Sequence, residues 1–428
     1  MRNTKKLVLV TVSALLIGAA FPYVDFAMDK TYEQLKVIVD VLELIKDSYV
    51  EQIDPQKLVY GAAKGMVAEL DDFSQFMEPD VYDRVKSDTE GEFGGIGIRV
   101  DVKDGWLTVV TPLPGTPAWN AGMMPGDKIV KIEGKTTRDM VIDEAIKQLR
   151  GKPGTKVNIT TAREPEDKNA DWITKDISIT RELIKTENVK WKMLDDKLGY
   201  VKIIEFTGHV TENVEKALSE LKGKGMEGLV IDLRYNPGGL LAAAVDISKM
   251  FMNDNKMIVY TKGRKPENYQ EFRANGTAPY ETLPLVILIN RYSASASEIV
   301  SGAMQDNKRA VIVGERSFGK ASVQSMIPLS DKSALRLTIA KYYTPSGKSI
   351  QHDANNEHGG IIPDIPVKVP LETEKKLLQQ DEELFYPGKK EEDKPEKKKD
   401  SVPDEVLNRA VELLKAREVL GNLKPAAK

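Results

Sequence analysis

Three short apolar runs, each followed by a turn of polar and small residues, most constrain the fold of this chain of 428 residues. The runs cover residues 229–233, 285–289 and 310–313. An apolar run of about four to eight residues that is bounded by turn signals is typical of a buried strand. Strand and helix patterns alternate from residue 182 to residue 370. This alternation predicts an α/β core.

The turns after the second and third runs carry a serine and a lysine that could act together. Ser295 lies within residues 290–298, and Lys320 lies within residues 317–324. A serine hydroxyl becomes a good nucleophile when a base takes its proton, and a neutral, desolvated lysine can be that base. The chain has three histidines, and none is close in sequence to either segment. Lysine is therefore the better candidate base.

Each of these two motifs also has a simpler interpretation. Ser295 and Glu298 have the spacing of a capping box, so Ser295 could merely begin a helix that reaches about Asn307. Residues 314–320 match the first seven positions of a phosphate-binding P-loop, but Ala321 stands where a magnesium-binding Ser or Thr is needed. The candidate metal-binding strand, residues 229–232, also precedes this loop instead of following it. Both departures argue against nucleotide hydrolysis.

The turn after the first run supplies candidate oxyanion donors. It contains Pro237, Gly238 and Gly239 and leads into an alanine-rich segment, residues 240–251. The first turn of a helix leaves backbone N–H groups without intrahelical acceptors. Such groups suit an oxyanion hole, in which donors are fixed where negative charge develops. Alone, this segment could be an ordinary connection between a strand and a helix, but together the three junctions indicate an active site.

The sequence resembles the carboxyl-terminal processing (tail-specific) proteases from about residue 32 to residue 370. Four blocks carry the resemblance in the order of that family: residues 92–98, 232–239, 293–298 and 318–324. The resemblance implies that Ser295 is the nucleophile and that Lys320 is the general base. It also implies that Gln324 orients the lysine, and one helical turn between positions 320 and 324 would place both side chains on one face.

The same resemblance implies the remaining parts of the site. The oxyanion donors would be the backbone N–H groups of Ala296 and of the turn formed by Gly238 and Gly239. Ser295 would form an acyl-enzyme while Lys320 accepts and returns the proton, with no metal and no other cofactor. The chain departs from the family at Tyr235, where asparagine is common. We expect this departure to affect the shape of the loop.

Residues 90–181 have many short strand patterns and turn signals. This region resembles a PDZ domain. One segment looks like the carboxylate-binding loop of such a domain: Gly94, Gly95, Ile96, Gly97 and Ile98. Glycines let successive N–H groups converge on a terminal carboxylate. A helix over residues 143–149 would flank the groove, with Ile146 and Leu149 as wall residues. The glycines alone would favour a glycine-rich hairpin, whereas the flanking helix and residues 125–129 favour the PDZ domain, which would bind exposed apolar C-terminal tails.

Composition narrows the remaining choices. The 62 basic and 65 acidic side chains nearly balance, so no global field recruits nucleic acid. The absence of cysteine excludes disulfides, thiol nucleophiles and thiolate metal sites. His209, His352 and His358 are expected to be solvated, and no metal site is expected. A triad of Ser295, His209 and Asp232 remains open, although nothing in the sequence favours it over Lys320.

The ends of the chain suggest its location and assembly. Arg2, Lys5 and Lys6 precede an apolar stretch, residues 7–21, with the length of a signal-peptide core. We therefore expect an exported, periplasmic or otherwise extracytoplasmic protein, whose N-terminus is either cleaved or kept as an inner-membrane anchor. Two helices expected within residues 28–89 can bury little alone, which favours a homo-oligomer, with a dimer as the simplest form.

The predicted architecture is multidomain and of the α+β class, with a PDZ domain inserted beside an α/β protease core of the ClpP/crotonase-like kind. The predicted segments are a signal or anchor (1–27), a helical region (28–89), the PDZ domain (90–181), the core (182–370), a charged linker (371–401) and a helical segment (402–428). The alternative function is a PDZ scaffold on an inactive protease-like core, which would bind tails without cutting them. The presence of Ser295, Lys320 and Gln324 argues against it.

Overall fold

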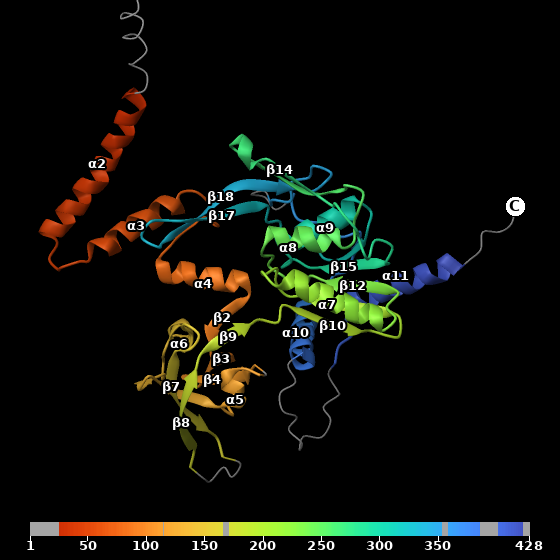
Figure 1. Ribbon diagram of the computed structural model, residues 1–428, viewed down its shortest axis with the longest axis horizontal. Coiled ribbons are helices and arrows are strands. Elements are labelled where there is room, and N and C mark those ends of the chain that lie inside the picture. Colours follow the sequence, from red (N-terminus) through yellow and green to blue (C-terminus); the bar gives the residue numbers. More distant parts are fainter. Residues whose placement is uncertain (1–24, 114, 166–170, 353–357, 386–400, 423–428) are drawn as a thin grey trace, which may run out of the picture. The chain divides into compact units, whose positions relative to one another are not determined.

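The computed structural model describes residues 25–113, 115–165, 171–352, 358–385 and 401–422 (Figure 1). The chain forms two compact units, residues 1–78 with 327–336 and residues 79–326 with 337–428. The apolar N-terminal stretch, residues 7–21, lies outside the described residues. Among the helices that are described, none is both long and apolar enough to cross a bilayer.

The first unit contains helices α2 (Asp25–Ser48) and α3 (Pro55–Ala68) and strand β1 (Gln75–Met77). The Asp54 carboxylate caps α3 by accepting the N–H of Gln56 at 2.9 Å. β1 pairs antiparallel with residues 334–336. A small core joins Tyr60 and Phe76 to Leu335. By contrast, α2 exposes many apolar side chains to solvent.

The second unit is built on a six-stranded sheet with the order β10–β11–β12–β15–β16–β19. β10 is antiparallel to β11, and the neighbours that follow are parallel. β12 and β15 are buried along their whole length, as central strands covered on both faces should be. The strands are β10 (Val189–Met193), β11 (Leu198–Ile203), β12 (Gly228–Asp232), β15 (Leu285–Ile289), β16 (Val311–Gly314) and β19 (Ile365–Pro366).

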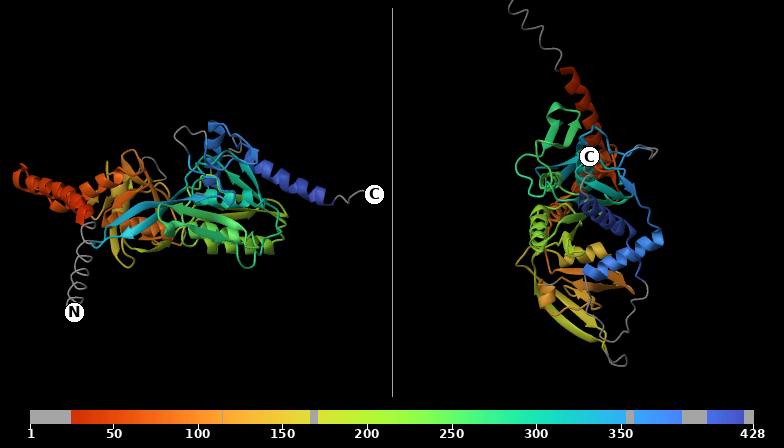
Figure 2. Two further views of the ribbon diagram at one scale, coloured as in Figure 1. Left: turned by 90° about the horizontal axis from the view of Figure 1, so that it is seen from above. Right: turned by 90° about the vertical axis from the view of Figure 1, so that its right-hand side faces the viewer.

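Helices cover both faces of this sheet. One face packs into a large core with α7 (Val210–Gly223), α8 (Leu241–Lys249) and α9 (Ala296–Asp306). The other face carries Val230 and Leu288 and packs against α11 (Glu405–Asn422). Because neighbouring residues of a strand point to opposite faces, Ile231 and Val230 belong to different cores. Figure 2 shows α11 running toward the C-terminal end of the chain.

The region predicted as a PDZ domain has its own sheet and its own core. The sheet has the order β3–β4–β5–β7–β8, with β6 beside β5, and a separate ribbon pairs β2 with β9. Its core contains Ile96, Leu107, Ile129 and Leu149. The elements are α4 (Pro79–Glu90), β2 (Glu92–Gly95), β3 (Ile98–Lys103), β4 (Trp106–Pro112), α5 (Pro117–Asn120), β5 (Lys128–Ile132), β6 (Lys135–Thr136), α6 (Ile142–Leu149), β7 (Lys156–Arg163), β8 (Ile173–Thr180) and β9 (Glu182–Lys185).

Two sequence-based predictions are wrong here. Residues 320–324 do not form a helical turn, because β17 (Ser322–Pro328) pairs with β18 (Ala334–Tyr343). The first part of the predicted charged linker is helix α10 (Leu371–Phe385), and residues 386–400 lie outside the described residues. The prediction failed because α10 is rich in charged residues. It nevertheless contributes Leu377 and Leu378 to the lining of a cavity of the core, and its Glu374 is buried. The remaining elements are β13 (Met257–Gly263), η1 (Pro266–Asn268) and β14 (Gln270–Arg273).

Candidate active site

The three predicted turns meet at one edge of the central sheet. β12, β15 and β16 are parallel neighbours, so the turns that follow them leave from the same edge. The Ala294 N–H donates to the Asn236 carbonyl at 3.0 Å, and the Phe318 N–H donates to the Ser293 carbonyl at 3.0 Å. The backbone therefore joins the serine segment to both the glycine turn and the lysine loop.

Ser295 has an unusual backbone conformation at the start of α9. Its φ of 54° and ψ of −113° lie where few residues other than glycine occur. Such a conformation costs on the order of 1–3 kcal/mol and persists only when its surroundings hold it. The sharp turn from a strand into a helix leaves the serine half-buried, as in a nucleophile elbow. The helix ends with Asn307 as its C-cap, as the sequence predicts.

Glu298 holds this turn and the lysine loop together. One carboxylate oxygen accepts the N–H groups of Ser295 at 2.8 Å and Lys320 at 2.9 Å. The other accepts the Gly319 N–H and the Ser317 hydroxyl, each at 2.6 Å. The capping-box glutamate that the sequence indicates thus also anchors the lysine loop. Burial raises the pKa of the Glu298 carboxyl to about 7, although these four donors lower it.

Gly238 lies against the serine, and its neighbour is better placed to be a donor. At the φ of 103° found for Gly238, an added Cβ would lie 2.7 Å from the Cβ of Ser295. The Gly238 N–H donates to the side-chain oxygen of Asn236 at 2.8 Å, so the proposed oxyanion role of this N–H is not supported. Within the described part of the chain, the N–H groups of Gly239 and Ala296 have no acceptor.

Tyr342 is a site residue that sequence reasoning missed. Its side chain is buried in β18, and its hydroxyl donates to the Lys320 carbonyl. The same hydroxyl hydrogen-bonds with the side chain of Ser295. Lys320 lies half-buried in the loop between β16 and β17, and Gln324 lies half-buried in β17. A tyrosine in an apolar strand is typical of a core residue, so the sequence offers no signal for this contact.

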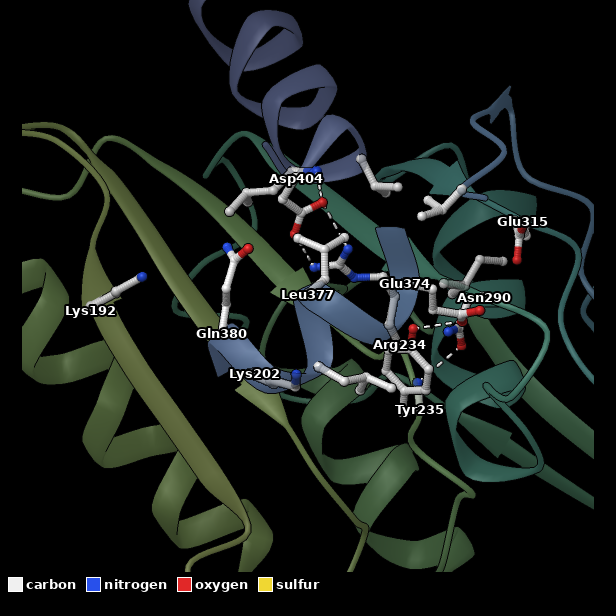
Figure 3. Close-up of a pocket in the computed structure, with 15 residues that line it drawn as sticks. Lys192, Lys202, Arg234, Tyr235, Asn290, Glu315, Glu374, Leu377, Gln380 and Asp404 are labelled. Carbon is white, nitrogen blue, oxygen red and sulfur yellow. Dashed lines mark hydrogen bonds and ion pairs between the residues drawn. The ribbon is translucent and has the colours of Figure 1, made fainter. Parts of the chain in front are cut away.

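A charged cluster holds Arg234, near the start of the glycine turn, and Figure 3 shows the contact of Arg234 with Asp404. The Arg234 guanidinium contacts the buried Asp232 carboxylate at 2.6 Å and the Asp404 carboxylate at 2.8 Å. Burial alone would raise the pKa of Asp232, but Arg234 outweighs it and holds that pKa below its usual value. The cluster borders a cavity of about 220 Å³ that α10 and α11 help to line.

The histidine alternative gains no support. Asp232 is already paired with Arg234 and accepts the Tyr200 hydroxyl at 2.8 Å. His209 is the N-cap of α7, as expected, and its Nε2 lies 3.4 Å from Oε2 of Glu92. Neither residue of the proposed acid–histidine pair therefore has the other as its partner. Among the described residues, no group of three or more acidic or histidine side chains could hold a metal ion.

The predicted tail-binding loop borders a groove in the second unit. A cavity of about 560 Å³ lies between the start of β3 and α6. Six of the predicted residues line it: Gly95, Ile96, Gly97, Ile98, Ile146 and Leu149. Gly94 does not, because it packs on the backbone of Gly151, where an added Cβ would lie 2.1 Å from the carbonyl oxygen. Its glycine requirement is therefore one of packing. Phe93 and Arg150, which the sequence did not single out, also line the groove.

Comparison with known proteins identifies the family. Residues 197–367 match the model of peptidase family S41, residues 108–163 match a PDZ domain, and residues 22–81 match the N-terminal domain of the activating protease CtpB. A carboxy-terminal-processing protease of Bartonella bacilliformis is 40% identical over 95% of this chain and 94% of its own length. A carboxyl-terminal-processing protease of Synechocystis sp. is 36% identical over 77% and 75% of the two chains. The carboxy-terminal processing protease CtpA of Bacillus subtilis is 34% identical over 80% of this chain and 69% of its own length. The chain therefore belongs to the carboxyl-terminal processing proteases of peptidase family S41.

Proposed function

We propose that this protein is a serine endopeptidase that cleaves proteins near their C-termini, with Ser295 as nucleophile and Lys320 as general base. The observation that carries the proposal is the buried Glu298 carboxylate, which binds the backbone of both residues. A fixed link of this kind suits two groups that must exchange a proton. The strained conformation of Ser295 supports the same assignment, because strain of this kind clusters at functional sites.

The proposed reaction has two steps. The Ser295 oxygen attacks the carbonyl carbon of the scissile bond while the neutral Lys320 amine takes the hydroxyl proton. The N–H groups of Gly239 and Ala296 stabilise the oxyanion. The C–N bond then breaks, and Lys320 gives the proton to the leaving amine. Water attacks the acyl ester with Lys320 again as base, which releases the new C-terminus and restores Ser295. Gln324 would orient the lysine amine.

The groove beside β3 suits an extended peptide as the substrate-recognition element. A peptide can add a strand to an exposed sheet edge, and the N–H groups of a glycine loop can bind its terminal carboxylate. Ile96 and Ile146 give the groove an apolar lining that favours apolar C-terminal residues. The names of the relatives agree with this choice of substrate, since all three are processing proteases that act at carboxyl termini.

We also propose that the protein is exported and that it forms a dimer, for reasons that are separate from those for its activity. The basic residues before the apolar stretch 7–21 support export to an extracytoplasmic compartment. The exposed apolar side chains of α2 support assembly into a dimer.

One experiment tests the activity directly. Purified protein is incubated with a folded substrate that carries an apolar C-terminal tail, in the presence of a metal chelator. We expect cleavage near the tail by the wild type and none by Ser295→Ala, which should still bind the tail peptide. Wild-type turnover in Ser295→Ala would refute the assignment of the nucleophile. Tail binding without cleavage by the wild type would instead indicate an inactive scaffold.

A further inference from the structure

We propose that Glu374 of helix α10 is a positioning residue for the oxyanion turn and that it acts through Tyr235. This inference rests on the proposed function, because it treats the turn at Gly239 as an oxyanion donor. Glu374 lies outside residues 197–367, the part of the chain that matches the model of the protease family. A positioning role for Glu374 would therefore mean that the C-terminal segment helps to shape the active site.

Tyr235 needs support because of its backbone. Its φ of 64° is in the left-handed region, which asparagine tolerates and tyrosine rarely adopts. This chain therefore holds a residue that is poorly suited to the backbone of the turn. Three contacts fix it. Its N–H donates to the side-chain oxygen of Asn290 at 3.0 Å, and its hydroxyl donates to Glu374 at 2.6 Å (Figure 3). Its ring also stacks on Tyr292, with ring centroids 5.6 Å apart.

Glu374 contacts both turns of the site from one buried position. Its side chain is about 8% exposed, and its second oxygen pairs with the Arg291 guanidinium. Tyr235 precedes the donors of the glycine turn, and Arg291 precedes the nucleophile Ser295 in the neighbouring turn. Burial and the Glu374 carboxylate raise the pKa of the Tyr235 hydroxyl, so it remains a hydrogen-bond donor at neutral pH. One carboxylate thus links the two turns.

The preceding residue of the turn, Arg234, is also held by a carboxylate from the C-terminal segment. Asp404, just before α11, accepts two hydrogen bonds from Arg234 at 2.9 and 2.8 Å. Consecutive residues of the turn, Arg234 and Tyr235, are therefore held by carboxylates from two different parts of the C-terminal segment. Arg234 is already fixed by Asp232, whereas the Tyr235 hydroxyl is fixed by Glu374. The test therefore concentrates on Glu374.

A double-mutant cycle separates this role from general stability. Glu374→Ala should lower kcat about tenfold, a coupling within the range found for residues in direct contact. Glu374→Gln, which keeps an acceptor for the tyrosine hydroxyl, should retain most of the activity. Tyr235→Asn supplies the second background of the cycle, because asparagine suits the left-handed backbone and lacks the hydroxyl that contacts Glu374. In that background, Glu374→Ala should lower kcat by less than about threefold.

The controls distinguish a positioning role from a structural one. KM for the tailed substrate and the affinity of a free tail peptide should not change in any of these variants. Glu372→Ala, in the same helix but with an exposed side chain, should have wild-type kcat. Hydrogen exchange at residues 235–239 should accelerate in Glu374→Ala, and also in Tyr235→Phe, which removes only the hydroxyl.

The outcomes are separable. If Glu374→Ala leaves both kcat and hydrogen exchange of the turn unchanged, the positioning role is refuted. If its effect on kcat is equally large in the Tyr235→Asn background, Glu374 does not act through Tyr235 and the proposal is also refuted. If the wild type cleaves nothing, the proposed protease activity fails, and hydrogen exchange alone then shows whether Glu374 holds the turn.

Discussion

Replacement of Glu298 by glutamine tests whether one buried charge holds the Ser295 and Lys320 segments in register. The carboxylate accepts four hydrogen bonds, two at each oxygen. Glutamine has one acceptor oxygen, so its NH₂ group must face two of these donors. The Ser317 hydroxyl can rotate to accept, but the Gly319 N–H beside it cannot. At least one buried N–H is thus left unsatisfied, at a cost of about 1–3 kcal/mol. If the lysine loop shifts to relieve this cost, kcat should fall by about 10- to 100-fold.

The same substitution should also change how stability depends on pH. Burial raises the pKa of Glu298 to about 7 from 4.5, so the folded state prefers the protonated carboxyl. This contribution to the free energy of unfolding is fully present below about pH 4.5 and is lost as the pH rises through 7. A difference of this size corresponds to about 3 kcal/mol. Glutamine cannot titrate, so stability should change less between pH 5 and 8 in the variant than in the wild type.

Two measurements check this reasoning. Urea unfolding at several pH values gives the stability of both proteins, and kcat is measured with a tailed substrate at pH 8. Glu412→Gln is the matched control, because its carboxylate is exposed and pairs with Arg409 on the surface. Parallel stability curves for the wild type and Glu298→Gln would show that the carboxyl does not titrate near neutrality. An unchanged kcat would show that its hydrogen bonds do not position the lysine.

Two further substitutions test the proposed base. Lys320→Arg should abolish turnover despite its conserved charge, because arginine stays protonated and cannot take a proton; retained cleavage would return attention to His209. Gln324→Glu should place a negative charge near the lysine amine, raise the pKa of Lys320 and reduce the rate at pH 7 more than at pH 9. Profiles of rate against pH for the wild type and Gln324→Glu measure this shift, and superimposable profiles would mean that Gln324 does not contact the base.

Local patterns were sufficient to predict the frame of the site. The apolar runs before the three turns are strands, and the pattern after Ser295 is a helix that ends at Asn307. These elements follow from hydrophobic periodicity and capping, which depend on residues near in sequence. The parallel pairing of β12, β15 and β16 then places the three turns at one edge.

Contacts between residues distant in sequence could not be predicted in this way. Tyr342 contacts the serine and the lysine loop only because β18 pairs with β17, and a tyrosine in such a strand has the pattern of a core residue. Helix α10 has so many charges that the sequence suggested a solvated linker, although Glu374 is buried among polar partners. The pairing of a strand also explains why no helical turn joins Lys320 to Gln324.

Two residues with left-handed backbones, Ser295 and Tyr235, stand in turns that follow neighbouring strands. Neither is a residue that the local sequence would favour in this conformation. Each is held by a buried glutamate, Glu298 for the serine and Glu374 for the tyrosine. The strands that precede the two turns, β12 and β15, are buried along their whole length and pack into apolar cores on both faces, so the core does not rest on these two carboxylates alone. Loss of either glutamate should therefore relax its turn before it unfolds the core, which makes activity a more sensitive measure of these contacts than thermal stability.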